Sequence, residues 1–298
     1  MSPVAPYLHW ASAWSATAGV ERSNSIRVAS TVCLLRRGKR NDLPSVGSCA
    51  PRRHRWPADV TQTDSVTSRS ENLQALITRP RYVLFDFDGP ICRFFAGHAA
   101  DRVAVELVDW LDERGMQHPL TDEERRSTDP WDVLRAVDRR HHGKDLVVEL
   151  EERLTQEELR AASSAAPTAH ADLLVRRLAE RGVRLAVTTN NSPDAARKYL
   201  ADHGLEACFG PHVYGRTHDV SRLKPHPDCV LRALTALDAD PADALMVGDS
   251  PSDLVAAQRA GVAFLGYVRN DRKEQQLRDA GAEHLVSSLE DVLRALDG

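Results

Sequence analysis

The sequence predicts an α/β fold: a doubly wound, Rossmann-like parallel sheet with an α-helical domain inserted into it. Two observations carry this prediction. From residue 81 onward, short apolar runs alternate with amphipathic helical segments, as in parallel strands joined by crossover helices. Between the first and second apolar runs, residues 92–167 are dominated by helical periodicity instead, which indicates the inserted domain.

The first predicted strand is the run YVLF at residues 82–85, whose apolar side chains suit a strand buried on both faces. Two carboxylates, Asp86 and Asp88, follow where that strand ends, and Gly89 lets the backbone turn tightly beside them. Ligands of doubly wound sheets bind at the carboxyl ends of strands. This pair of carboxylates is therefore placed for chemistry.

Three amphipathic segments are predicted in the inserted domain. In residues 99–115, apolar side chains recur every three or four positions. Residues 121–124, TDEE, fit a capping box, and Pro130 stands near the start of the second long helix. The third helix covers residues 145–162.

The rest of the chain continues the alternation of strands and helices. We expect helices at 170–182, 192–204, 225–237 and 252–261, strands at 183–190, 244–250 and 262–268, a short strand at 283–288, and a last helix after it. Ser192 is expected to cap its helix, with Pro193 in the first position and Gly204 at the end.

This pattern divides the chain into three parts. Residues 80–91 and 168–298 form the predicted sheet domain, and residues 92–167 form the inserted helical domain. Residues 1–79 show no sustained period and are rich in Ser, Arg, Pro and Thr, so we expect a disordered N-terminal extension. An Arg-rich targeting segment and a weak polyanion-binding arm are the alternatives.

Composition argues against several function classes. The formal net charge of −4 predicts neither a nucleic-acid-binding nor a membrane-surface protein. The sequence has no run of about 18 apolar residues, so no membrane span is predicted. The five cysteines are scattered, without a CxxC pair, which favours a reducing compartment and hence the cytoplasm. The oligomeric state is left open.

Polar residues gather at the predicted strand ends. The set comprises Asp86, Asp88, Thr189, Asn190, Asp249 and Asp253, together with Lys224 ahead of a helix. Carboxylates brought this close repel one another unless a cation neutralises them. Oxygen ligands favour a hard cation, and Mg²⁺ is the usual one where phosphate is the substrate. One Asp can then act as nucleophile while a second transfers protons.

Four motifs occur in order along the chain: DFDGP, TTN, LKP and GDSPSD. Together they resemble the four motifs of the haloacid-dehalogenase-like (HAD) hydrolase superfamily, over roughly residues 81–297. The inserted domain resembles the helical cap of the phosphoglycolate-phosphatase-like subgroup. Pro90 departs from the Thr or Val that is usual at that position, and it removes a backbone N–H beside the site.

The resemblance implies roles for the four carboxylates. Asp86 is the nucleophile and a Mg²⁺ ligand, and Asp88 is the general acid and base. Asp249 and Asp253 complete the predicted metal group, in which Asp88 is also placed. Superfamily dehalogenases usually lack an Asp two residues after the nucleophile, so Asp88 favours phosphoryl transfer.

Substrate binding is predicted for residues of the second and third motifs. By resemblance, Thr189 binds the phosphoryl group beside Asn190, and Lys224 steadies that group and the nucleophile. Thr188 is the alternative to Thr189, since adjacent side chains on a strand point in opposite directions. Arg93, just past the first motif, is expected to meet a substrate anion, and a solvated hinge residue is the alternative.

These inferences predict an enzyme, a Mg²⁺-dependent phosphatase that hydrolyses a small phosphorylated metabolite through an aspartyl-phosphate intermediate. A phosphomutase of the same fold is the enzymatic alternative, since the sequence does not show how long the intermediate lives. A non-catalytic HAD-like binding or regulatory module is the alternative from a different class. Neither a nucleic-acid partner nor a membrane partner is expected.

Overall fold

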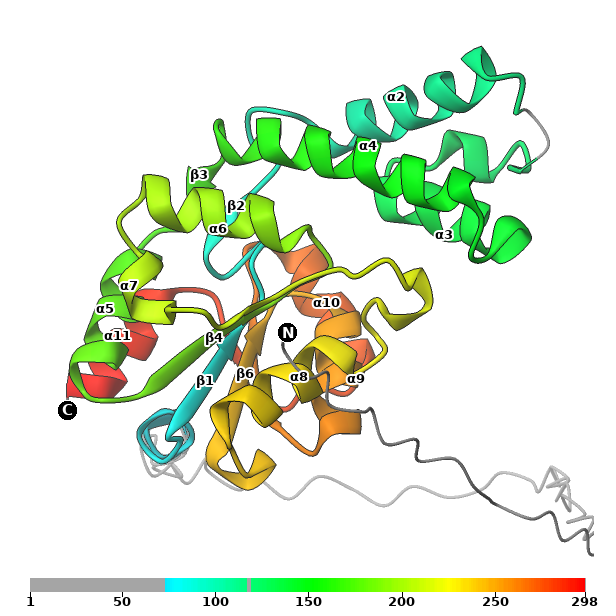
Figure 1. The fold of residues 1–298 in the computed structure, drawn as a ribbon. Helices are drawn as coiled ribbons and strands as arrows, with labels where there is room; N and C mark the ends of the chain where they lie inside the picture. Colours follow the sequence, from blue (N-terminus) through cyan, green and yellow to red (C-terminus); the bar gives the residue numbers. More distant parts are fainter. Residues whose placement is uncertain (1–72, 117–118, 298) are drawn as a thin grey trace, which may run out of the picture. The chain divides into compact units, whose positions relative to one another are not determined.

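The computed structural model describes residues 73–116 and 119–297, and a six-stranded sheet lies at their centre (Figure 1). Its strand order is β5-β4-β1-β6-β7-β8, and every neighbouring pair is parallel. The strands are β1 (Tyr82–Phe85), β4 (Arg184–Thr188), β5 (Val213–Tyr214), β6 (Ala244–Gly248), β7 (Ala263–Tyr267) and β8 (Leu285–Val286). The predicted doubly wound parallel sheet is confirmed.

Side chains of β1 alternate between the two faces of the sheet. Val83 and Phe85 pack into one hydrophobic cluster, whereas Tyr82 and Leu84 pack into a second. Helices α5 (Ala171–Glu180), α6 (Pro193–Asp202), α7 (Glu206–Phe209) and α11 (Leu289–Asp297) cover the first face, and α8 (Asp228–Leu237), α9 (Pro251–Ala260) and α10 (Asp271–Asp279) cover the second (Figure 1). Burial on both faces explains why the run YVLF is apolar throughout.

The inserted domain, called the cap below, is residues 92–167. An antiparallel ribbon of β2 (Cys92–Arg93) and β3 (Ala166–Pro167) forms its two ends. The cap contains α2 (Ala100–Glu113), α3 (Pro130–His141) and α4 (Asp145–Ala162). Their apolar faces build a third cluster, which includes Leu107, Leu134 and Leu150. Val220 and Leu223, from beyond the cap, belong to the same cluster, so the cap core extends onto the segment that follows β5.

Local sequence signals explain where several helices begin. The backbone N–H of Thr121 donates to Glu124 Oε2 at 2.7 Å, and the Glu124 N–H donates to Thr121 Oγ1 at 3.2 Å. This is the predicted capping box. The Ser192 side chain accepts from the Asp194 N–H at 3.3 Å, and Pro193 is the first residue of α6, as predicted.

The sheet domain begins earlier than predicted. Residues 73–78 are helical, Ile77 is only 3% exposed within the first cluster, and Leu76 packs against that cluster. The expected extension over residues 1–79 is therefore wrong for its last residues, because an apolar helical turn just ahead of β1 buries itself against the sheet domain. The remainder of that expectation, residues 1–72, lies outside the described residues.

The alternation of strands and helices did not predict α7, β5 or α10. The first two are too short to show a period. In α10 the only buried residue is Leu277, so the helix has almost no apolar stripe. Short 3₁₀ helices lie at η1 (Glu124–Arg126), η2 (Val220–Arg222) and η3 (Pro241–Asp243). None of the helices within the described part of the chain has the length and apolar character needed to cross a membrane.

Candidate active site

Asp86 stands at the carboxyl end of the central strand. Its backbone N–H donates to the carbonyl of Val247 in the neighbouring strand β6 at 2.8 Å, and the residue is only 7% exposed. Asp249 follows the end of β6. Strands β1 and β6 flank the point where the chain reverses direction across the sheet. Both carboxylates therefore occupy the ligand-binding position of doubly wound folds.

Lys224 lies among these carboxylates. Its ammonium donates to Asp86 Oδ1 at 2.7 Å and to the Thr188 carbonyl at 2.9 Å, and lies 2.6 Å from Asp253 Oδ1. Burial would lower the pKa of Lys224, but the charges of Asp253 and Asp86 outweigh that effect and raise it. Lys224 is therefore a buried, permanently charged contact of the predicted nucleophile.

The turn that carries Asp253 is built by its own side chains. Asp253 Oδ2 accepts from the backbone N–H groups of Ser250 at 3.0 Å and Asp249 at 3.2 Å, and Ser250 Oγ accepts in return from the Asp253 N–H at 3.3 Å. A Cβ on Gly248 would lie 2.6 Å from Asp253 Cβ, so only glycine fits there. The motif GDSPSD thus fixes Asp253 beneath the strand end.

Gly89 brings the first motif against Asp249. It has φ +131°, and a Cβ on it would lie 2.5 Å from Asp249 Cγ. The preceding residue, Asp88, accepts from the Phe94 N–H at 2.9 Å. Burial raises the pKa of Asp88, against the effects of that hydrogen bond and of the nearby cations Arg269 and Lys273. A raised pKa favours the protonated form that a general acid needs.

Three of the four predicted metal ligands come together. One oxygen each of Asp86, Asp249 and Asp253 lies within 4.8 Å of the others. Burial and the charge of Asp253 raise the pKa of Asp86 to about 8 despite the opposing effect of Lys224. Burial also raises the pKa of Asp249 to about 6, although the cation Lys273 opposes it. A bound cation would offset the repulsion between these carboxylates and lower their pKa values again. Carboxylate oxygens are ligands that suit Mg²⁺.

The fourth predicted ligand, Asp88, is not part of this group. Its carboxylate is absent from the three-residue cluster, and Oδ1 is instead bonded to the Phe94 N–H. The geometry gives Asp88 a position beside the metal group rather than within it. A metal role for this side chain remains only a prediction, whereas its placement suits proton transfer.

Residues of the second motif surround Lys224. Asn190 Oδ1 accepts from the Lys224 N–H at 2.7 Å, and its amide donates to the Lys224 carbonyl at 3.3 Å, so Asn190 holds the lysine backbone. Thr189 Oγ1 donates to Asn191 Oδ1 at 2.8 Å. Thr188 Oγ1 is buried and has no hydrogen-bond partner among the described residues. The choice of Thr189 over Thr188 for phosphoryl binding stays a prediction.

One charged residue of the site was missed from the sequence. Lys273 Nζ lies 3.1 Å from Asp249 Oδ2, and Lys273 belongs to the polar helix α10 that was not predicted. Asn270, which caps α10 by accepting from the Lys273 N–H at 2.9 Å, was the available signal. Arg93 is exposed on β2, and its substrate contact stays a prediction.

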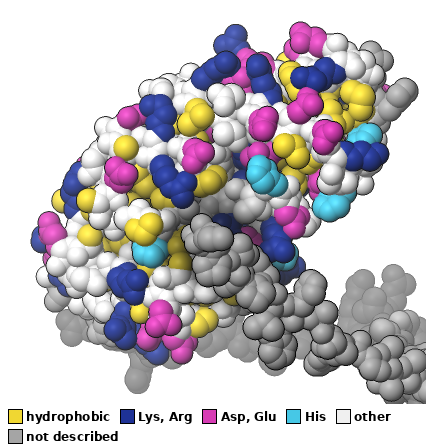
Figure 2. Space-filling model, viewed as in Figure 1, with side chains coloured by type: hydrophobic (Ala, Val, Ile, Leu, Met, Phe, Trp, Pro, Cys, Tyr) yellow, Lys and Arg dark blue, Asp and Glu magenta, His cyan; other side chains and the backbone are white. Residues whose placement is uncertain are grey.

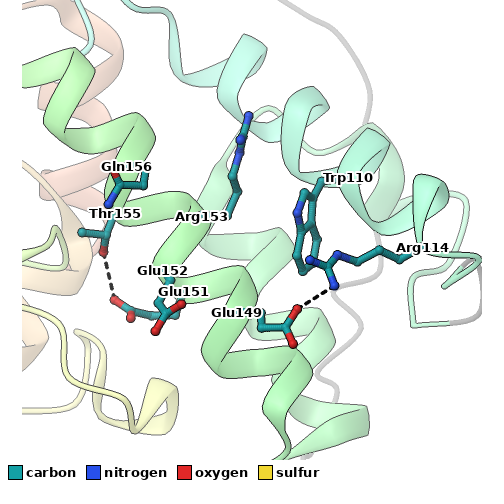
Figure 3. A pocket seen from close by; sticks show the side chains of 8 residues that line it. All are labelled: Trp110, Arg114, Glu149, Glu151, Glu152, Arg153, Thr155 and Gln156. Atoms are coloured by element: carbon teal, nitrogen blue, oxygen red, sulfur yellow. Dashed lines mark hydrogen bonds and ion pairs between the residues drawn. The ribbon is translucent and has the colours of Figure 1, made fainter.

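A depression in the cap contains none of the predicted site residues. It has a volume of about 660 Å³ and lies between α2 and α4, as Figure 3 shows. Arg114 stacks 4.1 Å from the centre of the Trp110 ring and pairs with Glu149 at 2.7 Å. This cap groove is therefore a surface feature separate from the carboxylate group.

Comparison with known proteins decides the family. Residues 80–261 match the family described as haloacid dehalogenase-like hydrolases. The chain belongs to this family. The match begins just before β1 and ends after α9, so it contains all four motifs and the whole cap.

Individual relatives and a solved structure are also similar to this chain. A protein of Caldanaerobacter subterraneus, provisionally named pyrophosphatase PpaX, is 27% identical to this chain. The match covers 72% of this chain and 94% of that protein. Pyrophosphatase PpaX of Halalkalibacterium halodurans is 33% identical over 40% of this chain. The match spans about half (54%) of the length of that protein. The crystal structure of a predicted phosphatase from Clostridium acetobutylicum is similar to this chain with a TM-score of 0.56 and 18% sequence identity. The similarity covers 73% of this chain and 98% of that protein, and it shows that the two share a fold. The chain is thus a HAD-like enzyme of the phosphatase type.

Proposed function

We propose that the protein is a Mg²⁺-dependent phosphatase that hydrolyses a small phosphorylated metabolite through an aspartyl-phosphate intermediate on Asp86. One observation carries the proposal. Asp86 is buried at the end of the central strand, with Lys224 bonded to its Oδ1 and with Asp249 and Asp253 close enough to share a cation with it. A structural turn has no need of this costly set of buried charges.

The side chains support a two-step reaction. Lys224 holds Asp86 Oδ1, which leaves Oδ2 for attack on phosphorus. The ester P–O bond breaks, and Asp88 gives its proton to the leaving oxygen. In the second step Asp88 takes a proton from water as that water attacks phosphorus, and the bond to Asp86 breaks to release phosphate. Mg²⁺ held by Asp86, Asp249 and Asp253 would neutralise carboxylate and phosphoryl charge.

Substrate and location extend the proposal. Two relatives are named pyrophosphatases, which supports testing pyrophosphate beside small phosphate esters. We place the enzyme in the cytoplasm, since the cysteines of the described residues, Cys92, Cys208 and Cys229, are all free thiols. Neither a nucleic acid nor a membrane is part of the proposed function.

Phosphate release by the purified chain tests the proposal. The substrates would be p-nitrophenyl phosphate, pyrophosphate and a panel of small phosphate esters, each with Mg²⁺ and with excess EDTA. We expect Mg²⁺-dependent release of inorganic phosphate. Transfer of the phosphoryl group to a second position of the substrate, without release, would favour the mutase. Absence of turnover on the whole panel would favour the non-catalytic module.

A further inference from the structure

Arg216, just after β5, is a buried cation outside the four motifs. Its side chain is fully buried, and each of its five N–H donors has an acceptor. Nε donates to Glu151 at 3.0 Å, Nη1 to Glu158 at 2.9 Å and to the Asn190 carbonyl at 3.1 Å, and Nη2 to Thr155 at 3.0 Å and Glu158 at 2.9 Å. One guanidinium thus joins the cap to the loop that follows β4.

The three acceptors in the cap share one flank of α4. Glu151, Thr155 and Glu158 are spaced four and three residues apart, which places their side chains along one face of a helix. Glu151 and Thr155 are also among the side chains that line the cap groove (Figure 3). The flank of α4 that meets Arg216 therefore borders the groove, and Glu158 is the acceptor on this flank that does not line it.

Glu158 itself contacts the loop directly. It is fully buried, and its Oε2 accepts from the Ser192 N–H at 2.8 Å while Oε1 accepts from the Asn191 amide at 3.3 Å. The Arg216 N–H donates to the Asn191 carbonyl at 2.9 Å, and a Cβ on Gly215 would lie 2.4 Å from that carbonyl oxygen. The loop at 190–192 is thus held on both sides, by the cap and by the segment after β5.

We infer that Glu158 and Arg216 are positioning residues. Through them the cap sets the geometry of the loop at 190–192, which directly follows Thr189, the predicted phosphoryl-binding residue. The contacts continue from that loop to the reacting group. Asn190 holds the backbone of Lys224, and Lys224 is bonded to Asp86. The cap then takes part in the chemistry through a buried ion pair, in addition to covering the site. This inference rests on the proposed function.

The neighbouring residue of α4 supplies a matched control. Glu157 is also fully buried, pairs with Arg160 at 2.7 Å and Arg153 at 3.0 Å, and contacts the His98 ring at 3.0 Å. All three of these partners belong to the cap, so none of these contacts joins Glu157 to the loop at 190–192. Each variant removes the charge of a fully buried carboxylate from its ion pairs, so both changes should lower stability. Arg153 and Arg160 are 36% and 60% exposed, whereas Arg216 is buried and keeps Glu151 as a partner.

The experiment compares Glu158→Gln with Glu157→Gln in the full chain. We expect Glu158→Gln to raise KM for p-nitrophenyl phosphate, and to weaken binding of inorganic phosphate about tenfold, as the loss of one strong hydrogen bond would. Glu157→Gln should leave both values within about twofold of the wild type. Partial unfolding alone lowers the active fraction and hence the apparent kcat, with KM unchanged. Equal KM and phosphate affinity in the two variants would overturn the inference.

Hydrogen–deuterium exchange separates this inference from the proposed function. Glu158→Gln should speed amide exchange at residues 189–192, and Glu157→Gln should not, whether or not any phosphate ester is hydrolysed. Unchanged exchange in that loop would overturn the positioning role even in an active phosphatase. If Glu158→Gln does not fold, Arg216→Lys serves instead, because it keeps the charge but loses the two-pronged contact. The same loop and the same KM should then change.

Discussion

The carboxylate group at the sheet edge and the cap groove both contain clustered charges, yet they differ in burial. In the groove, Arg114 and Glu149 pair while their side chains remain 48% and 44% exposed. At the sheet edge, the side chains of Lys224 and Asp253 pair while only 3% and 1% exposed. On the face drawn in Figure 2, acidic and basic side chains lie interspersed over much of the surface. Charge density alone therefore does not mark the site.

The cost of burial is what distinguishes the two regions. An exposed ion pair contributes about 0–1 kcal/mol, and losing it changes little. Charges taken out of water cost several kcal/mol each before pairing. The three buried carboxylates of the site outnumber the two lysines that contact them, Lys224 and Lys273. A further cation would offset the remaining repulsion between the carboxylates. Among the described residues that line the groove, no three carboxylates lie close enough together to share a cation.

The largest effect is expected at the nucleophile. Asp86→Asn should lower turnover by at least about a thousandfold, because an amide does not attack phosphorus at a useful rate. The melting temperature should stay the same or rise, since one of three repelling carboxylates is gone. Steady-state kinetics and thermal unfolding of the same preparation check both statements. A variant with more than a small fraction of wild-type turnover would remove Asp86 from the nucleophile role.

Metal removal comes next in size. Excess EDTA should abolish activity and Mg²⁺ should restore it, whereas Ca²⁺ should inhibit, because its looser coordination misplaces the attacking oxygen. Asp249→Asn should raise the Mg²⁺ concentration for half-maximal rate about tenfold or more. It should also reduce the rise in melting temperature that Mg²⁺ causes, which is measured without substrate. Full activity in EDTA would contradict a metal role for this group.

A smaller effect is expected at Glu124 in the cap. Its bond from the Thr121 N–H, with help from Arg140 and Arg139, lowers its pKa to about 2. A carboxylate with a lowered pKa stabilises the fold above its ordinary pKa of about 4.5, and this contribution is lost as pH falls to about 2. Glu124→Gln should therefore lower the melting temperature by a few degrees at pH 7, with KM unchanged. The difference in melting temperature between the wild type and Glu124→Gln should be smaller at pH 3 than at pH 7. An equal difference at both pH values would argue against this linkage.

The smallest effect is expected in the cap groove. Arg114→Gln removes the exposed pair with Glu149 and the contact with Trp110. We expect kcat and KM within about twofold of the wild type and stability within about 0.5 kcal/mol. Denaturant unfolding and kinetics on one phosphate ester provide the measurement. A tenfold rise in KM would instead make the groove part of the substrate site.

The sequence predicted the parts of the molecule whose signals are local. Strand β1 and the motif GDSPSD combine a buried apolar run with polar residues directly after it, and both stand where they were expected. Lys273 was missed because α10 buries only Leu277 and so lacks an apolar period. The short helix around Ile77 was missed for a similar reason, since two turns are too few to show periodicity.

Other site contacts depend on folding and have no local signal. Glu158 lies in the stretch EERLTQEEL, where nothing in the sequence separates it from Glu151 or Glu157. Only the packing of α4 against the sheet domain places Glu158 on Arg216, far along the chain, and turns Glu157 toward other cap residues. The Thr188 and Thr189 pair is ambiguous for a related reason, since one residue of register decides which hydroxyl faces the site.

The strand order also has a consequence for protein synthesis. Tyr82 in β1 pairs with Arg184 on one side and Ala244 on the other, so the strand that bears Asp86 leaves the ribosome long before either partner exists. The cap helices share a hydrophobic cluster with Val220 and Leu223, so that cluster is complete only after residue 223 has emerged. Until β4 and β6 follow, the apolar run YVLF has both edges open, a state prone to mispairing. Slow translation between residues 162 and 248 would prolong the exposure of these strand edges. Chains stalled within that range should therefore aggregate more than chains that have passed residue 248.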